Sequence, residues 1–118
     1  MVTININIKG INSDDTLILE LDNGQDASTV DARRGDWIQW VIESGSGVGT
    51  ITSIFDTSSV QIFGSRTMPA KESNSQNREG RIDPNQSGLP KTESYCIYYT
   101  KTGSGQDYHH DQRIQVLS

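Results

Sequence analysis

Hydrophobic and polar residues alternate with a period of two along several short stretches of the chain. The clearest stretch is at the amino end, where Val2, Ile4, Ile6 and Ile8 alternate with polar neighbours. Successive side chains of a strand point to opposite faces of a sheet, so this pattern predicts a strand with four aliphatic side chains on one face. No window shows the helical period of 3.6 residues. The pattern therefore predicts an all-β fold.

Turn residues separate further strands at intervals of about ten residues. A strand over 17–21 comes after the turn cluster 12–15 and before Asn23-Gly24, a dipeptide typical of two-residue hairpins. Either the first two strands pair with each other, or Asn23-Gly24 forms the hairpin. Short strands are also expected at 28–32, 37–42, 50–55, 60–63, 94–100 and 113–117.

The stretch 37–42 contains both tryptophans of the chain. Ile38, Trp40 and Ile42 share one face of the predicted strand, and Trp37 lies on the other face. We expect the face with Trp40 to belong to the core.

Residues 64–92 interrupt the alternation, since they are mostly Ser, Asn, Gln, Pro and charged residues. We predict a long polar loop at about 64–92, with one short strand around Arg81-Ile82. Loops of this length are usually functional or mobile. Seven to nine short strands in 118 residues predict a single domain over 1–118, folded as a Greek-key β-sandwich.

Composition excludes several classes of protein. The net charge of -5, with Arg33 and Arg34 as the longest basic run, argues against a nucleic-acid partner. Cys96 is the single cysteine, so the fold has no internal disulfide. No apolar stretch approaches the length of a membrane span, and the amino end reads as a strand and not as an export signal. We therefore expect no membrane partner and a cytoplasmic location.

Two segments carry short motifs of a known family. Gly35-Asp36-Trp37-Ile38-Gln39-Trp40 resembles the "G-D-x-V-x-W" strand of the cupredoxin family. The stretches 94–99 and 114–116 resemble its paired closing strands, "G-x-Y-x-F-x-C" and "G-x-I-x-V". The resemblance covers about half of the chain and implies a cupredoxin-like fold.

The copper ligands that this resemblance implies are not all present. Type 1 copper takes two His, one Cys and often a Met. The first His is expected near 47–49, where the chain has none, and the position of the family's Cys is occupied by Tyr99. His109 and His110 follow, but no Met comes after Met68. The chain is therefore more similar to copper-free bacterial cupredoxin-like domains of unknown function, which end in "His-x-Asp-Pro-x-Ile-x-Val"; residues 109–116 match that segment, with Gln112 in place of Pro.

Two groups of residues are candidates for chemistry at a metal or thiol. In an extended segment Asp107, His109 and Asp111 share one side, an arrangement that suits a zinc or copper site. The candidate metal ligands are His109, the adjacent His110 and Asp111. The alternative is that the two His residues are ordinary surface or turn residues. Cys96 is either a reactive thiol or, as is more common for a lone Cys, a small buried hydrophobe.

An exposed aromatic surface formed by Trp37 and Tyr98 is a further candidate, either for a sugar ring or for a protein. The alternative is that the long loop covers these rings. The leading hypothesis is a non-catalytic binding or structural module without a cofactor, whose partner is an unknown protein or small ligand. The alternatives are a metal-binding protein that uses the His109/His110 cluster and a carbohydrate-binding module. An exposed sheet edge would also allow a homodimer.

Overall fold

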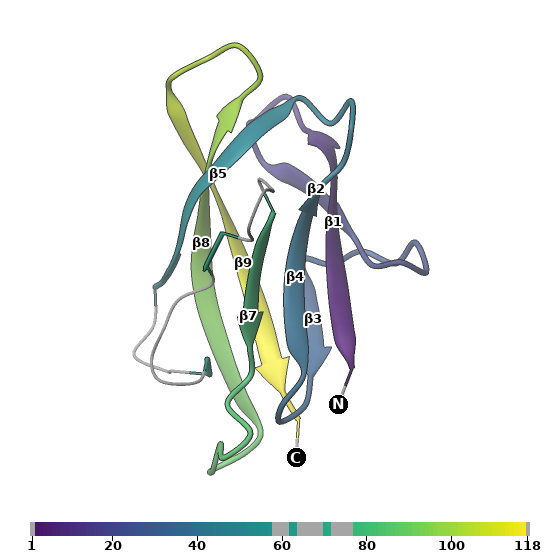
Figure 1. The fold of residues 1–118 in the computed structure, drawn as a ribbon, viewed down its shortest axis with the longest axis vertical. Coiled ribbons are helices and arrows are strands. Elements are labelled where there is room, and N and C mark those ends of the chain that lie inside the picture. The colour runs from purple at the N-terminus through teal and green to yellow at the C-terminus, as the bar shows by residue number, and fades with distance from the viewer. Residues whose placement is uncertain (1, 58–61, 64–69, 72–76, 118) are drawn as a thin grey trace.

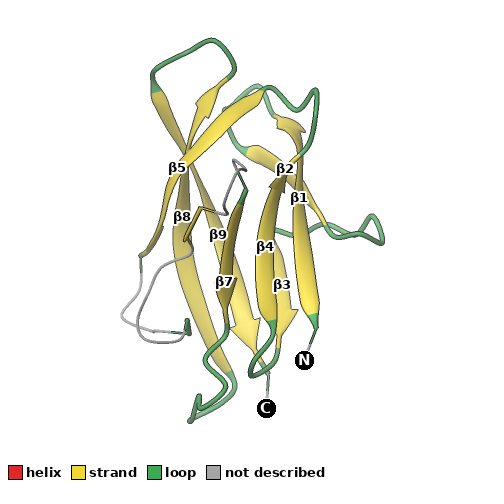
Figure 2. Cartoon of the chain, in the orientation of Figure 1, coloured by secondary structure: helices red, strands yellow, loops and turns green. Residues whose placement is uncertain are grey.

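The fold is an all-β sandwich. The computed structural model of the chain describes residues 2–57, 62–63, 70–71 and 77–117. These residues form strands joined by turns and loops, without a helix (Figures 1 and 2). The strands form two mixed sheets that pack face to face. The predicted fold class, an all-β sandwich, is confirmed.

The first sheet has five strands in the order β2-β1-β4-β7-β6. β1 and β4 run parallel, with Thr3 opposite Trp37, and the other neighbouring pairs are antiparallel. The parallel pair arises because the chain crosses to the other sheet between β2 and β4. The strands are β1 (Thr3–Ile11), β2 (Leu17–Glu20), β4 (Trp37–Ile42), β6 (Ala70–Lys71) and β7 (Arg78–Arg81).

The second sheet has four strands in the order β3-β9-β8-β5. β3 runs parallel to β9, while β9, β8 and β5 are antiparallel neighbours. β8 and β9 form a long ladder from Lys91 opposite Val116 to Thr100 opposite Asp107, and they occupy the centre of the sheet. The strands are β3 (Thr29–Ala32), β5 (Val48–Asp56), β8 (Lys91–Lys101) and β9 (Asp107–Val116).

The core lies between the two sheets and contains the side chains on the inward face of the alternating strands. Ile38 and Trp40 are fully buried on β4, as predicted, and Ile42 is half-buried. The Trp40 ring meets the ring of Tyr95 from β8 edge-on, with 5.7 Å between the centroids, so an aromatic pair joins the two sheets. Val2 was predicted to share the buried face of the first strand, but it is 59% exposed because it precedes β1.

Both alternatives for the first hairpin occur. β1 and β2 pair antiparallel across the turn at 12–16. Asn23-Gly24 forms a second, smaller hairpin, in which the Leu21 N–H donates to the Gln25 carbonyl at 2.8 Å and Glu20 bridges to Asp26.

The short strand predicted around Arg81-Ile82 is confirmed, because β7 ends at Arg81 and Ile82 forms a bridge with Phe63, but the described part of the predicted polar loop 64–92 contains more strand than expected. β7 pairs with β4, with Arg81 opposite Trp37, and β8 already begins at Lys91. The sequence of β7 is polar and does not alternate, so its pattern did not predict the full strand. Backbone hydrogen bonds to β4 hold it in the sheet. Residues 60 and 61 of the predicted strand 60–63 lie outside the described residues, while Ile62 and Phe63 are buried.

Candidate functional site

The predicted metal ligands lie on β9, which begins at Asp107 and not at Arg113 as predicted. His109 and Asp111 are exposed on the outer face of the four-stranded sheet, as the alternation predicted. His110 points to the opposite face, where its Nδ1 accepts a hydrogen bond from the Leu17 N–H at 3.1 Å. The strand therefore separates the two His side chains.

The environment of His110 leaves its ring without a free lone pair. Because Nδ1 accepts the Leu17 N–H, the ring proton of the neutral side chain is on Nε2. Nε2 is buried and has no hydrogen-bond partner among the described residues. Burial lowers the pKa of His110 from its usual value of 6.5, which keeps the ring neutral. Within the part of the chain that the structure describes, no three His, Cys, Asp or Glu side chains are grouped so that they hold a metal ion.

The two predicted aromatic surface residues lie on different sheets. Trp37 is 39% exposed on the five-stranded sheet, where the Arg81 guanidinium lies 5.9 Å from the ring centroid. Tyr98 lies on β8, in the four-stranded sheet. The outer faces of a two-sheet sandwich point in opposite directions, so these two rings do not form one surface.

The outer face of the four-stranded sheet carries three rows of side chains, which run from β5 through β8 to β9. The rows are Ser53–Tyr98–His109, Phe55–Cys96–Asp111 and Thr57–Ser94–Arg113. The last row continues onto β3, because Thr29 is opposite Arg113. Aromatic and thiol side chains therefore adjoin a row of hydroxyl groups with one guanidinium group. We call these three rows and Thr29 the outer face.

Aromatic contacts connect side chains in the rows Ser53–Tyr98–His109 and Phe55–Cys96–Asp111 of the outer face. The Tyr98 ring lies 6.0 Å from the Phe55 centroid and 6.1 Å from the His109 centroid. Phe55 is 53% exposed, so its ring is open to a ligand. Burial, together with the hydrogen bond and charge of Asp111, raises the pKa of the Cys96 thiol. Cys96 is thus a buried, protonated thiol beside these rings, and the prediction of a small buried hydrophobe fits its position.

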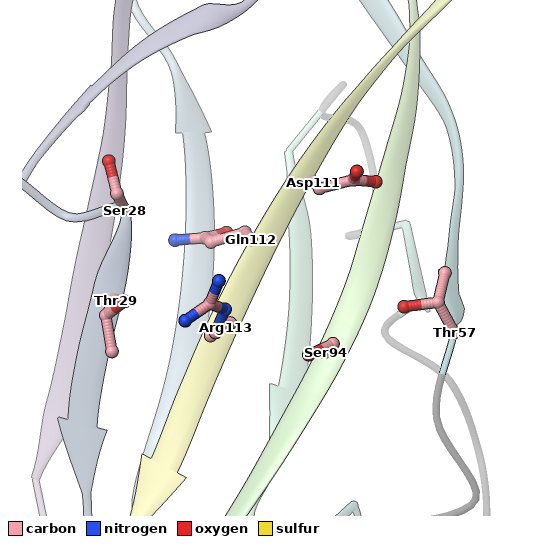
Figure 3. A pocket seen from close by; sticks show the side chains of 7 residues that line it. All are labelled: Ser28, Thr29, Thr57, Ser94, Asp111, Gln112 and Arg113. Atoms are coloured by element: carbon pink, nitrogen blue, oxygen red, sulfur yellow. The ribbon is translucent and has the colours of Figure 1, made fainter.

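A hollow of about 340 Å³ lies over the row Thr57–Ser94–Arg113. Asp111 and Arg113 are exposed and Gln112 between them on β9 is buried, so the Gln112 side chain belongs to the opposite face of the strand. Figure 3 shows the side chains that line the hollow. The hydroxyl groups come from three different strands or their ends. The lining residues are Ser28, Thr29, Thr57, Ser94, Asp111, Gln112 and Arg113.

Gln112 connects the floor of this hollow to the core. Its side-chain oxygen accepts hydrogen bonds from the Trp40 Nε1 at 3.1 Å and from the Tyr95 hydroxyl, and its amide nitrogen donates to the Ala27 carbonyl. These bonds tie β9 to β4, to β8 and to the segment before β3. They fix the strand from which Asp111 and Arg113 project.

Glu93, on β8, is a buried polar side chain like Gln112. It is 0% exposed, and neither carboxyl oxygen has a hydrogen-bond partner among the described residues. Burial and the neighbouring Asp56 charge raise its pKa from 4.5 to about 8. Glu93 is therefore protonated at neutral pH.

Sequence reasoning missed Phe55, Ser94 and Arg113 as members of one surface. The alternation in the sequence indicates on which side of its strand each of them lies. It does not indicate that the strands are neighbours in the order β3-β9-β8-β5. No protein-family model and no curated protein matches the chain. Across the described residues no helix is long and apolar enough to cross a membrane. The outer face is therefore interpreted from its own chemistry.

Proposed function

We propose that the protein is a non-catalytic binding module and that the outer face is its ligand surface. The observation that carries the proposal is a hydroxyl-lined hollow of about 340 Å³ on the same outer face as the exposed Phe55 ring, which lies in the adjacent row of side chains. An exposed apolar side chain next to a concave group of polar side chains is typical of a ligand site. The hollow has the size of a site for one small ligand unit.

A saccharide fits this surface better than an extended peptide. Within the hollow, the backbone groups of β8 and β9 are used by neighbouring strands on both sides, so a ligand there meets side chains, and the free edges of this sheet belong to β3 and β5. Ligand contacts are therefore made by side chains alone. A sugar presents hydroxyl groups, which pair with Ser, Thr, Asp and Arg, and an apolar C–H face, which packs on an aromatic ring. This proposal moves the carbohydrate-binding alternative from Trp37 to the Phe55 and Tyr98 side of the molecule.

We also propose that the fold is cupredoxin-like, with Greek-key connections. In support, two of the stretches that carry the resemblance, 35–40 and 94–99, contact each other in the core, beside Gln112 of the closing strand β9. Trp40 of β4 and Tyr95 of β8 contact each other and both donate hydrogen bonds to Gln112 of β9. The pairing of β8 with β9 agrees with the paired closing strands that the resemblance implies.

The chemistry of the titratable groups supports a non-catalytic role. A nucleophilic Cys needs a lowered pKa, whereas burial raises that of Cys96. His110 is held neutral by burial and bonds to the Leu17 backbone. The same contact disfavours the metal-binding alternative at His110.

Binding arrays test the proposed function. The purified protein is applied to an array of plant, bacterial and animal oligosaccharides, together with Phe55→Ala and Trp37→Ala variants. Both substitutions remove an exposed ring, but Trp37 lies on the other sheet. We expect binding to a subset of the glycans, weakened roughly tenfold by Phe55→Ala and unchanged by Trp37→Ala. Glycan binding that only Trp37→Ala reduces would place the ligand on the other sheet and refute the proposal.

A further inference from the structure

Arg113 has a distinct position on the outer face. It lies on β9 between Ser94 of β8 and Thr29 of β3, so hydroxyl side chains flank it on both neighbouring strands. Thr57 extends the same row, because its N–H donates to the Ser94 carbonyl at 2.8 Å. The ion pairs of the described residues join Lys9 to Glu43 and Lys101 to Asp15, and neither involves Arg113. The guanidinium group is therefore available to an external acceptor.

Resting on the proposed function, we propose that the ligand is an acidic saccharide whose uronic-acid carboxylate binds Arg113. The planar guanidinium group matches a carboxylate with two parallel hydrogen bonds, which a neutral hydroxyl group cannot form. The side chains of Thr29, Thr57 and Ser94 lie within the same hollow and bind the sugar hydroxyl groups. The exposed Phe55 ring, in the adjacent row, packs on the C–H face of the sugar.

Asp111 is the opposing charge that this assignment has to accommodate. It lies two residues before Arg113 on the same face of β9 and lines the same hollow. In Figure 3 the carboxyl group of Asp111 and the guanidinium group of Arg113 turn to opposite sides of β9. Asp111 interacts with the Cys96 thiol, which is opposite it on β8. Its charge weakens binding of an anion and sets a clear expectation for its removal.

The net charge of -5 does not prevent such a complex. At physiological salt, exposed charges more than about 8 Å apart are largely screened, so the contact is decided by the groups inside the hollow. Within it, Arg113 attracts the carboxylate and Asp111 repels it. Binding is therefore of moderate affinity and weakens as salt is added.

Calorimetric titration of the whole protein tests the inference. The probes are oligogalacturonate, alginate oligomers and hyaluronan oligomers, each compared with neutral glucose, mannose and xylose oligomers of the same length. The variants are Arg113→Gln, Asp111→Asn and, as a matched control, Arg81→Gln on the other sheet. Thermal unfolding of each variant confirms that it is folded.

We expect a uronic-acid oligomer to bind at least tenfold more tightly than its neutral counterpart. Arg113→Gln weakens that binding roughly tenfold. Asp111→Asn strengthens it about threefold, because it removes the repelling charge. Arg81→Gln leaves it unchanged. The opposite effects of the two charge changes separate a direct contact with an anion from a purely structural effect.

Two results would overturn the inference in distinguishable ways. If neutral and uronic-acid oligomers bind equally and Arg113→Gln has no effect, the carboxylate assignment is wrong while the saccharide-binding function stands. If no oligomer of either kind binds while all variants remain folded, the proposed function fails together with the inference.

Discussion

The buried carboxyl group of Glu93 leads to a quantitative prediction for the substitution Glu93→Gln. Glutamine keeps the shape of the protonated carboxyl group but does not titrate. Burial and the charge of Asp56 hold the pKa of Glu93 at about 8, against 4.5 for a solvated carboxyl group. Folding at neutral pH therefore requires Glu93 to take up a proton that the unfolded chain has released, and this linkage costs stability.

The cost at pH 7 follows from the separation of the two pKa values. Each pH unit between the pKa of 4.5 in the unfolded chain and pH 7 is worth about 1.4 kcal/mol, so the cost at pH 7 is about 3 kcal/mol, and the full shift to a pKa of about 8 would cost about 5 kcal/mol. Asp56 is only half-buried at the end of β5, so solvent there weakens its effect on Glu93. We therefore expect Glu93→Gln to raise the free energy of unfolding by about 2 kcal/mol at pH 7.

The pH dependence of this difference has a definite sign. Below pH 4.5 the carboxyl group is protonated in both states, so its contribution is the most favourable there. The contribution is lost as the pH rises from 4.5 through about 8, and it is constant above that range. The gain from Glu93→Gln is thus near zero at low pH and largest in alkaline solution.

Urea unfolding at pH 4, 7 and 9 measures this gain. Glu79→Gln is the matched control, because it makes the same substitution at an exposed position, on β7. A Glu93→Gln variant that is less stable than the wild type at pH 7, or whose stability difference does not change with pH, would refute the reasoning.

Three further predictions concern β9. We expect Gln112→Ala to lower the free energy of unfolding by about 3 to 5 kcal/mol in urea titrations, because the Trp40 Nε1, the Tyr95 hydroxyl and the Ala27 carbonyl all lose their partner; a loss below about 1 kcal/mol would contradict this. The lowered pKa of His110 means that the wild type loses stability as the pH falls below 6.5, and His110→Phe should lack this loss. At pH 8 we expect the variant to be about 1 kcal/mol less stable, because the Leu17 N–H has lost its acceptor. Urea unfolding at pH 5 and 8 measures both effects. In Zn(II) and Cu(II) titrations of the metal-stripped protein we expect only weak binding, abolished by His109→Ala, unchanged by His110→Ala and without an intense copper–thiolate band; micromolar binding that requires His110 would show that the ring leaves Leu17.

Strand alternation was the most informative feature of the sequence. It identified the inner face of β4, where Ile38 and Trp40 are buried, since a period of two shows on which side of a sheet each residue lies. The same reasoning placed His109 and Asp111 together on one face. It found only the end of β7, around Arg81, because the polar residues of this strand do not alternate and backbone pairing with β4 holds the strand in place.

Which strands are neighbours is not encoded in local patterns. Phe55 and Arg113 are far apart in the sequence, and they share the outer face because β5, β8 and β9 pair in that order. Trp37 and Tyr98 both point away from the core, but they lie on opposite sides of the molecule because their strands belong to different sheets. The sequence alone determined the all-β class and much of the inward or outward direction of the side chains, because these follow from chain geometry and hydrophobic burial. Only the tertiary structure decided which outward side chains form a common surface, because strand order depends on long-range pairing between segments that carry no mark of their partners.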